Sequence, residues 1–430
     1  MRGRNTFMIP QTARNDTKMS FDIVLYVMSF LISIMIVIQN GIKRLCLFVI
    51  GISFIPYDIE LINHLNSHRI LLLSFFLSIF VRRNEICKII RFPLLRTFVL
   101  VFVSYVMTAV MDSNQHLLPA VFQAHLVYAE TFGSIILGYV TLTGNKDFII
   151  LNRLLRKIIV ISSIYSIISL SLGYDIFNSM WEGSDSMKGG DRLRIASFFG
   201  NSHFAGFTMS VFVVYAIMID YMMGKKILFD YIIWLGIIAI VLTGSRSSIL
   251  CLLFGALYIW IVNAKITNYL VVIPILVLVI LLSTNLIQRF INSFMYSDVK
   301  MDEGSSITMR LQQLEYSIIY FKQNPWFGNG FRFFWNNIKA TDGYDSSMLL
   351  GAESFLFILL IERGIIQIFT IILCFTSLFY FFKKKTTTLN VLGTSLLILF
   401  LINSFATGND EKWIVVFPLI GLCIKNNEIN

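Results

Sequence analysis

Long apolar runs recur along this chain at short intervals, and they constrain its fold more than any other feature. A helix needs roughly 20 apolar residues to cross a bilayer, with some tilt allowed. Runs near this length lie at 21–39, 97–111, 120–142, 157–173, 203–223, 227–243, 247–263, 268–284, 364–382 and 389–406. Shorter runs lie at 44–57, 69–82 and 413–424. The pattern predicts an all-α integral membrane protein with about 12 or 13 transmembrane helices, forming one polytopic domain over the whole chain.

The composition excludes a soluble core. Apolar residues make up 56% of the chain and charged residues only 14%, and the mean hydropathy is +0.74. Soluble domains are about 45–50% apolar. The net charge of +10 resides mostly in short connectors, where it acts as a topology signal. We therefore expect membrane lipids as partners and no nucleic acid.

Lysines and arginines occupy alternate connectors, as the positive-inside rule expects of cytoplasmic loops. They are Arg82, Arg83, Lys88, Arg91 and Arg96; Lys146, Arg153, Arg156 and Lys157; Lys225 and Lys226; Lys265; and Lys383 to Lys385. The opposite connectors are predicted to be external: 112–119, 174–202, 243–247, 285–353 and 407–412. The start of the chain conflicts with this scheme. Lys43 and Arg44 also indicate a cytoplasmic connector, which would place the N-terminus outside despite its own basic residues.

The only long polar segment is 285–353, which we expect to be a large external loop, with 174–202 as a second one. Apolar and aromatic residues recur at helical spacing between Thr308 and Lys322. Asn324-Pro325 should end this helix, and Gly328 and Gly330 should loosen the chain beyond it. The pattern predicts an amphipathic helix lying against the mouth of the membrane domain.

Nothing in the sequence indicates a metal or a cofactor. The five cysteines form no Cys-x-x-Cys pair, and the five histidines lack the spacing of metal ligands. There is no phosphate-binding loop of the Gly-x-x-x-x-Gly-Lys type, so ATP bound by this chain is not the energy source. We expect neither a metal nor a cofactor.

Arg246 stands out because it lies in a short turn between two apolar runs, at the external surface. Ser245 and Ser247 flank it, and small residues with hydroxyl groups leave room for an anion and add hydrogen-bond donors. A diphosphate is the obvious anion at a membrane surface, and arginine suits it. The alternative is an arginine that reaches lipid head groups from a helix end.

Three further arginines are predicted in external segments: Arg310 in the amphipathic helix, and Arg192 and Arg194 in the loop before 203. Each one alone is as well explained by exposure to water. Together with Arg246 they predict a cationic mouth that binds phosphate groups.

Glu353 opens an apolar stretch near the external interface. It is a candidate general base in a partly dry site, although an acid at a helix N-terminus is also favoured by the helix dipole. Glu362 and Arg363 should pair with each other or with neighbouring helices. Asp58 and Glu60 could bind a metal, but two acids in a polar connector are usually only solvated.

Three blocks, taken in order, resemble the O-antigen polymerase and O-antigen ligase superfamily. Arg194–Gly206 resembles its Phe-Gly-Asn block, and Arg246–Leu250 resembles its Arg-x-x-x-Leu element. Ser306–Gly330 resembles its external-loop block, an Arg-led helix followed by a Pro-hydrophobic-Phe-Gly-x-Gly turn. The ligases carry His-Asn, nine residues and then Gly. Counting back from Gly364 puts Glu353 at the histidine position, which is more similar to the polymerases.

The resemblance implies a metal-independent, inverting glycosyltransferase with a fold related to the GT-C class, in the bacterial inner membrane, with its active site facing the periplasm. It implies undecaprenyl-diphosphate-linked oligosaccharides as substrates and a chain-length regulator as a further partner. The acceptor hydroxyl would attack the anomeric carbon and lipid diphosphate would leave. Glu353, Arg246 and Arg310 would be catalytic, and the substrate or diphosphate contacts would come from Arg192, Arg194, Asn201, His203, Ser245 and Ser247.

Two other functions compete with a polymerase. An O-antigen ligase would share the fold and use lipid A core as its acceptor. A transporter of lipid-linked oligosaccharides would more often show paired repeats and interrupted helices at mid-membrane. Neither is evident in the sequence, and the polar residues gather on one side instead.

Overall fold

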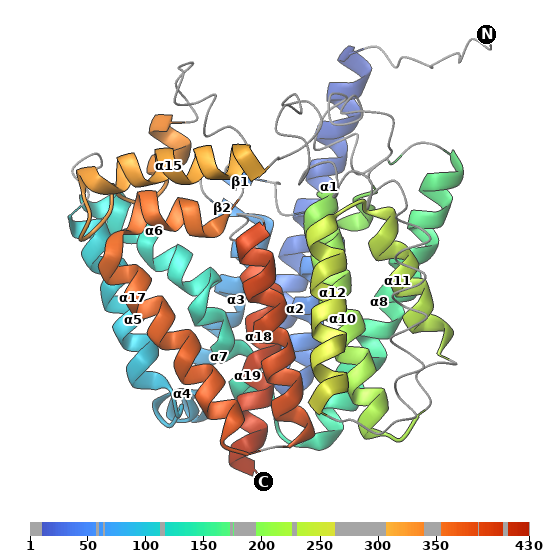
Figure 1. Cartoon of the computed structure of the whole chain (residues 1–430). Coiled ribbons are helices and arrows are strands. Elements are labelled where there is room, and N and C mark those ends of the chain that lie inside the picture. The colour runs from blue at the N-terminus through green and yellow to red at the C-terminus, as the bar shows by residue number, and fades with distance from the viewer. Residues whose placement is uncertain are drawn as a thin grey trace.

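The computed structural model describes residues 11–56, 60–62, 65–111, 117–172, 175, 195–225, 230–262, 307–338, 354–385, 387–406 and 412–429. Within these ranges the chain is almost entirely helical (Figure 1). The first half contains α1 (Gln11–Ile38), α2 (Gly41–Phe54), α3 (Ser67–Val81), α4 (Arg83–Ile90), α5 (Leu95–Val110), α6 (Leu117–Glu130), η1 (Phe132–Ser134), α7 (Ile135–Thr141) and α8 (Asn145–Leu172). A short antiparallel hairpin, β1 (Glu60–Ile62) and β2 (Leu65–Asn66), joins α2 to α3.

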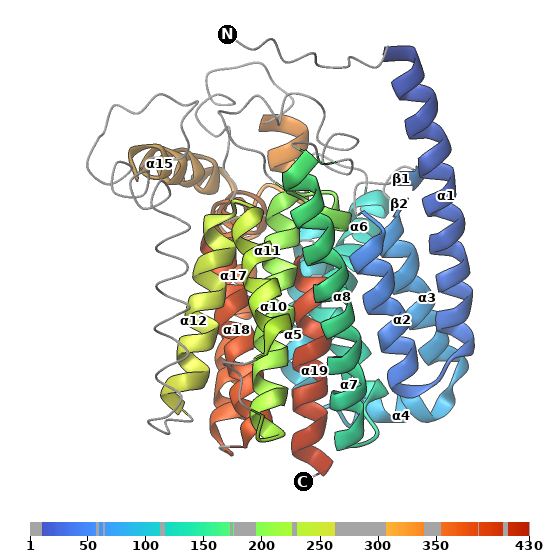
Figure 2. The same ribbon diagram turned by 90° about the vertical axis from the view of Figure 1, so that its right-hand side faces the viewer.

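The second half begins with the short helix η2 (Ser197–Phe199). The helices α10 (Ser202–Met222), α11 (Tyr231–Leu242), α12 (Arg246–Val262) and α15 (Ile307–Gln323) follow. A single π-helical turn, η6 (Phe334–Ile338), precedes α17 (Phe355–Lys383), α18 (Thr388–Ala406) and α19 (Trp413–Ile429). Most of these helices run roughly side by side, whereas α15 lies across one end of the bundle (Figures 1 and 2). This end is called the α15 side below.

The positively charged connectors gather at the end opposite α15. The turns next to α4, the start of α8 and the end of α17 all lie there, with the C-terminus (Figure 1). The N-terminal end of α1 lies on the α15 side, so α1 descends and Lys43 and Arg44 reach the opposite end with the other cations. This direction of α1 resolves the conflict that the basic N-terminus raised.

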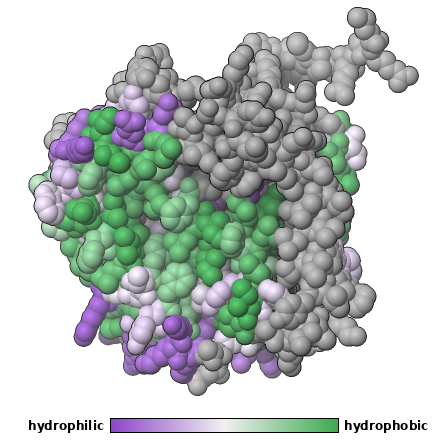
Figure 3. Space-filling model, viewed as in Figure 1, coloured by the Kyte–Doolittle hydropathy of each residue, from purple (hydrophilic) through white to green (hydrophobic). Residues whose placement is uncertain are grey.

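A hydrophobic band crosses the face seen in Figure 3, with hydrophilic residues above and below it. Large apolar side chains point outward and stay exposed on the peripheral helices, including Phe30, Phe80, Leu172 and Phe369. Exposed apolar surface on this scale is stable against lipid and not against water. The architecture is therefore that of an all-α integral membrane protein, as the sequence predicts.

By length and composition, four described helices can cross a membrane: α8, α10, α17 and α18 (as Thr388–Phe405). The pair α6 with Phe132–Thr141, which bends by 43° at its break, is either a broken fifth span or a re-entrant loop. Other apolar helices of the described ranges are shorter, with 10–17 residues. The predicted span at 268–284 lies outside the described residues. The expected total of about 12 or 13 spans therefore stays a prediction.

Buried ion pairs join helices at both ends of the bundle. On the α15 side, Arg69 of α3 binds Glu130 of α6 through two contacts, at 2.5 and 2.9 Å. At the opposite end, Arg44 of α2 donates to Glu85 of α4 at 2.8 Å. Ionisable groups within a membrane protein are costly unless paired, so these contacts fix the helices that carry them.

Candidate functional site

The block at 195–206 folds into a compact entry to α10. Gly200 adopts a left-handed conformation (φ 77°), which an L side chain would strain. Asn201 then caps α10, because its Oδ1 accepts hydrogen bonds from the backbone N–H groups of His203 (2.8 Å) and Phe204 (3.2 Å). Phe199 is buried against Phe204. The Phe-Gly-Asn pattern thus encodes an anchor, a left-handed turn and a helix cap.

Ser245 connects this entry to the start of α12. Its hydroxyl lies 3.3 Å from Nδ1 of His203 and 3.1 Å from the hydroxyl of Ser247, and it accepts a hydrogen bond from Ser248 at 2.8 Å. Ser245 and Ser248 are buried, and His203 is half-buried. The structure therefore brings together residues of two separately predicted segments, His203 from one and Ser245 and Ser247 from the other.

α10 and α12 approach closely at this point. A Cβ on Gly206 would lie 2.6 Å from the Ser248 hydroxyl and 2.7 Å from that of Thr243, so only glycine fits. One turn further, Ser210 donates to the backbone carbonyl of Ser248 at 2.9 Å. The two N-terminal helix ends are thereby held side by side on the α15 side.

Arg246 is the first residue of α12, two residues after the left-handed Gly244 (φ 66°), and it is half-buried. Arg246 therefore lies at the point where α10 and α12 begin. Helix N-termini carry unpaired backbone N–H groups and a partial positive charge. The hydroxyl groups of Ser245 and Ser247 and the imidazole of His203 lie together here, with Arg246 between the two serines in the chain. Groups of these kinds can bind an oxyanion.

The predicted amphipathic segment contains α15, whose second turn begins at Arg310. The side chains that α15 buries are Gln313 and Ser317, whereas Leu311, Ile318 and Ile319 remain exposed. These aliphatic residues do not form its packed face. α15 packs on α17 through the face that carries Gln313 and Ser317, together with Tyr316 and Tyr320.

The chain after α15 is tightly held, and the prediction that Gly328 and Gly330 loosen it is wrong. The backbone N–H groups of Asn329 and Gly330 donate to the carbonyls of Ile361 and Glu362, both at 3.1 Å. In return, Ile365 donates to the carbonyl of Pro325 at 2.8 Å. These bonds use groups that are free because α17 is broken at Gly364 (φ 66°, ψ 179°).

Glu362 and Arg363 lie at this break and are both buried. Glu362 accepts a hydrogen bond from the backbone N–H of Phe334 at 3.1 Å, and its Oε2 lies 3.8 Å from Nε of Arg363. The Arg363 guanidinium lies over the ring of Phe331, at 4.1 Å from its centroid. The expected pairing is present, and both residues also fix the connection that follows α15.

Sequence reasoning missed Lys412, which is fully buried immediately before α19. Its ammonium donates to Asn403 of α18 at 3.3 Å and lies 5.8 Å from the ring of Phe207. Phe207 is one helical turn below His203 on α10. A lysine in the external connector 407–412, directly before an apolar run, was the available signal.

Several predicted site residues lie outside the described residues: Arg192, Arg194, Glu353 and Asp58. For Arg310 and Glu60 the backbone is described and the side chain is not. Within the described ranges, no group of three His, Cys, Asp or Glu residues could hold a metal ion. The roles assigned to all of these residues remain predictions.

The chain was compared with curated proteins and with models of protein families. No curated protein matches the chain. The model of the family described as O-Antigen ligase matches residues 231–372, which span α11, α12, α15 and the break in α17. The matched segment contains Arg246, Arg310 and Glu353, together with both glycines that join α15 to α17. This match, over the segment that carries two of the three blocks, supports the resemblance to the O-antigen ligase/polymerase superfamily.

Proposed function

We propose that this protein is a polysaccharide polymerase that joins oligosaccharide repeat units carried on undecaprenyl diphosphate. The observation that carries the proposal is the cluster of His203, Ser245 and Ser247 at the N-terminal ends of α10 and α12, where Arg246 is the first residue of α12. This cluster lies on the α15 side, away from the positively charged connectors. The positive-inside rule makes that side external, which supports an inner-membrane enzyme that acts at the periplasmic face.

In this proposal the chain's own residues supply charge and a base, without a metal. Arg246, with Arg310 from α15 and with Arg192 and Arg194, binds the diphosphate and neutralises the negative charge that develops as it leaves. Glu353 takes the proton from the acceptor hydroxyl as that oxygen attacks the anomeric carbon. The bond from the anomeric carbon to the diphosphate oxygen breaks, and the configuration inverts.

Glu353, the proposed base, directly precedes Ser354 in the chain, and Ser354 is the residue before α17. The break at Gly364 ties α17 to the segment that follows α15. The helix carrying Arg310 and the helix that follows Glu353 are therefore parts of one connected unit. Such a connection supports a site in which both residues act on one substrate, because catalysis depends on fixed geometry.

A test is to delete the gene, complement it with the wild-type chain or variants, and examine cell-surface polysaccharide on a gel. A polymerase predicts that the deletion leaves a single repeat unit on the acceptor and that the wild-type chain restores the ladder. Bare lipid A core with accumulated lipid-linked polymer would instead identify an O-antigen ligase.

A transporter is distinguished in a purified system. Full-length protein in detergent, given lipid-linked repeat units and no transmembrane compartment, should release undecaprenyl diphosphate as the chain grows. A transporter would produce no new glycosidic bond under these conditions. A chain-length regulator is proposed as a partner that changes the length of the products.

A further inference from the structure

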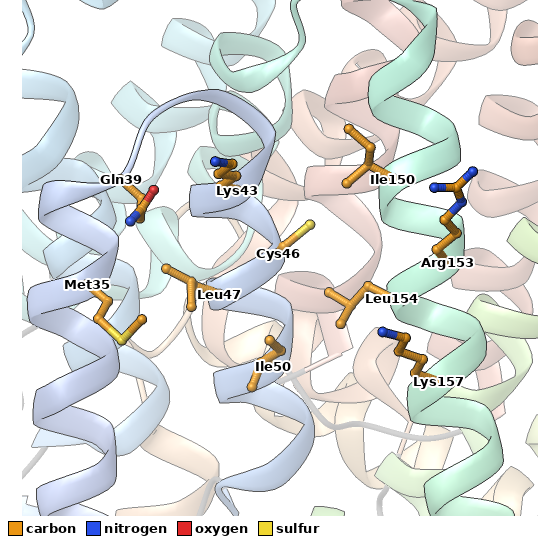
Figure 4. Close-up of a pocket in the computed structure, with 10 residues that line it drawn as sticks. All are labelled: Met35, Gln39, Lys43, Cys46, Leu47, Ile50, Ile150, Arg153, Leu154 and Lys157. Atoms are coloured by element: carbon orange, nitrogen blue, oxygen red, sulfur yellow. The ribbon is translucent and has the colours of Figure 1, made fainter.

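A cavity of about 480 Å³ lies between α1, α2 and α8, in the half of the bundle opposite α15. Figure 4 shows its lining: side chains from α1 and α2 face side chains from α8 across the gap. It is separated along the bundle from the cluster at Arg246, and the proposed function gives it no role.

Three cations without partners line this cavity. Lys43 of α2 lies toward the end that Gln39 occupies, whereas Lys157 of α8 lies deeper, at the level of Ile50 (Figure 4). Arg153 of α8 is the third, and all three are exposed. None of them forms a hydrogen bond or ion pair with the described part of the chain. Arg156 makes the contrast clear, because it lies on another face of α8 and binds both Asp220 and Asp230 at 2.5 Å.

Among the residues that the structure describes, no carboxylate lines the cavity. Asp147, at the start of α8, is buried and directs its carboxylate to the Thr143 hydroxyl (2.8 Å) and to the backbone N–H of Thr143 (2.7 Å). The three cations therefore remain available to a negatively charged group from outside the protein.

The rest of the lining is apolar. Met35 of α1, Leu47 and Ile50 of α2, and Ile150 and Leu154 of α8 provide it. Lys43 and Ile50 are separated by seven residues of α2, which is roughly 10 Å along a helix axis. The cavity thus presents cations beside an apolar wall that runs toward the bilayer interior, as an amphipathic ligand requires.

We infer that this cavity binds an anionic glycerophospholipid from the leaflet opposite α15, which the positive-inside rule identifies as cytoplasmic. The lipid phosphate contacts Lys43, Arg153 and Lys157, and an acyl chain lies along Leu47, Ile50 and Leu154. Basic pockets between transmembrane helices on that side suit anionic head groups, and apolar walls open to the bilayer suit acyl chains. The bound lipid connects α1 and α2 to α8.

The test is native mass spectrometry of the full-length protein in detergent, titrated with phosphatidylglycerol or with phosphatidylcholine of the same acyl chains. Wild type should prefer phosphatidylglycerol. The triple variant Lys43→Gln, Arg153→Gln, Lys157→Gln should lose roughly ten- to a hundredfold in phosphatidylglycerol affinity. The matched control changes three exposed cations at the same end of the bundle, Arg96, Lys383 and Lys384, to glutamine, and it should retain the preference.

Ile150→Trp tests the apolar wall without changing any charge, at a side chain that is 43% exposed. It should weaken binding of phosphatidylglycerol, and the thermal stabilisation by that lipid should fall in parallel. Equal affinity of wild type for the two lipids, or a triple variant that binds like wild type, would overturn the inference. Release of the lipid by an equal concentration of inorganic phosphate would also overturn it, because the acyl chains would then contribute nothing.

Discussion

Gly328 and Gly364 hold two backbone segments in direct contact: a Cβ on Gly364 would lie 2.4 Å from the amide nitrogen of Gly328. A Cβ on Gly328 would lie 2.3 Å from the carbonyl carbon of Glu362. Both glycines also have positive φ angles, of 76° and 66°. The close approach places the segment after α15 directly on the break in α17, and it explains why glycine is required at both positions.

Substituting either glycine by alanine should destabilise the protein by about 3 kcal/mol, combining roughly 1 kcal/mol of left-handed strain with about 2 kcal/mol of overpacking. Gly224→Ala is the matched control, because Gly224 has φ 69° and nothing within 4 Å of its Cβ position. It should cost only the strain, about 1 kcal/mol. Melting temperatures of the three variants, measured in the same detergent, give their order of stability. Equal melting temperatures for the three variants would show that the backbone contact contributes nothing.

Arg246→Ala and Arg310→Ala should each abolish polymer formation, and lysine should rescue either site poorly. A planar guanidinium donates two parallel hydrogen bonds to phosphate oxygens, whereas an ammonium is a point charge. The loss should be about 3–4 kcal/mol in the activation barrier, on the order of one oxyanion-type donor. Polymer on a gel is the measurement, and protein level in the same membranes is the check. Arg96→Ala, at the opposite end of the bundle, is the control. Normal polymer from well-expressed Arg246→Ala would identify a lipid-facing arginine.

The positions of many helices along the chain could be predicted from the sequence, because apolar runs and positively charged connectors are local signals. The helix expected over Thr308–Lys322 corresponds to α15, Ile307–Gln323. Its packed face could not be predicted. Gln313 and Ser317 are buried while Leu311 is 60% exposed, and only the position of α17 decides which face is covered.

Contacts between segments far apart in sequence were also beyond prediction. Gly328 and Gly364 are each ambiguous alone, since glycine marks flexible turns as often as close packing. The hydrogen bond between His203 and Ser245 joins residues 42 positions apart. The sequence blocks around His203 and Ser245 indicated which residue types form the site. Their distances depend on the packing of α10 against α12, which the sequence does not show.

Glu353→Gln should lower polymerisation by roughly 10²–10⁴-fold, the usual contribution of a positioned general base. The amide keeps the shape of the side chain and cannot take a proton. Lipid-linked substrate should still bind to this variant, and Glu353→Asp should retain some activity. Polymer formed at the wild-type rate by Glu353→Gln would leave Glu353 as a helix-end charge.

Treatment with a chelator should leave the rate of wild-type enzyme unchanged, because the proposed chemistry uses a carboxylate and arginines alone. The assay is polymer formation by purified protein before and after dialysis against EDTA. Loss of activity that returns with a divalent cation would favour a metal site at Asp58 and Glu60 over Glu353 as the base.

Lys412→Met should reduce polymerisation strongly while leaving the melting temperature unchanged or higher. A fully buried ammonium is costly, and replacing a buried charge by an apolar side chain of similar size is often neutral or stabilising. Because the ammonium lies next to Phe207, one turn below His203, we expect its charge to attract the proposed anionic substrate. Activity and melting temperature are measured on the same detergent preparation, with Lys412→Arg as the variant that keeps the charge. A structural lysine would give the opposite pattern, in which Lys412→Met loses stability first and any activity loss follows the amount of folded protein.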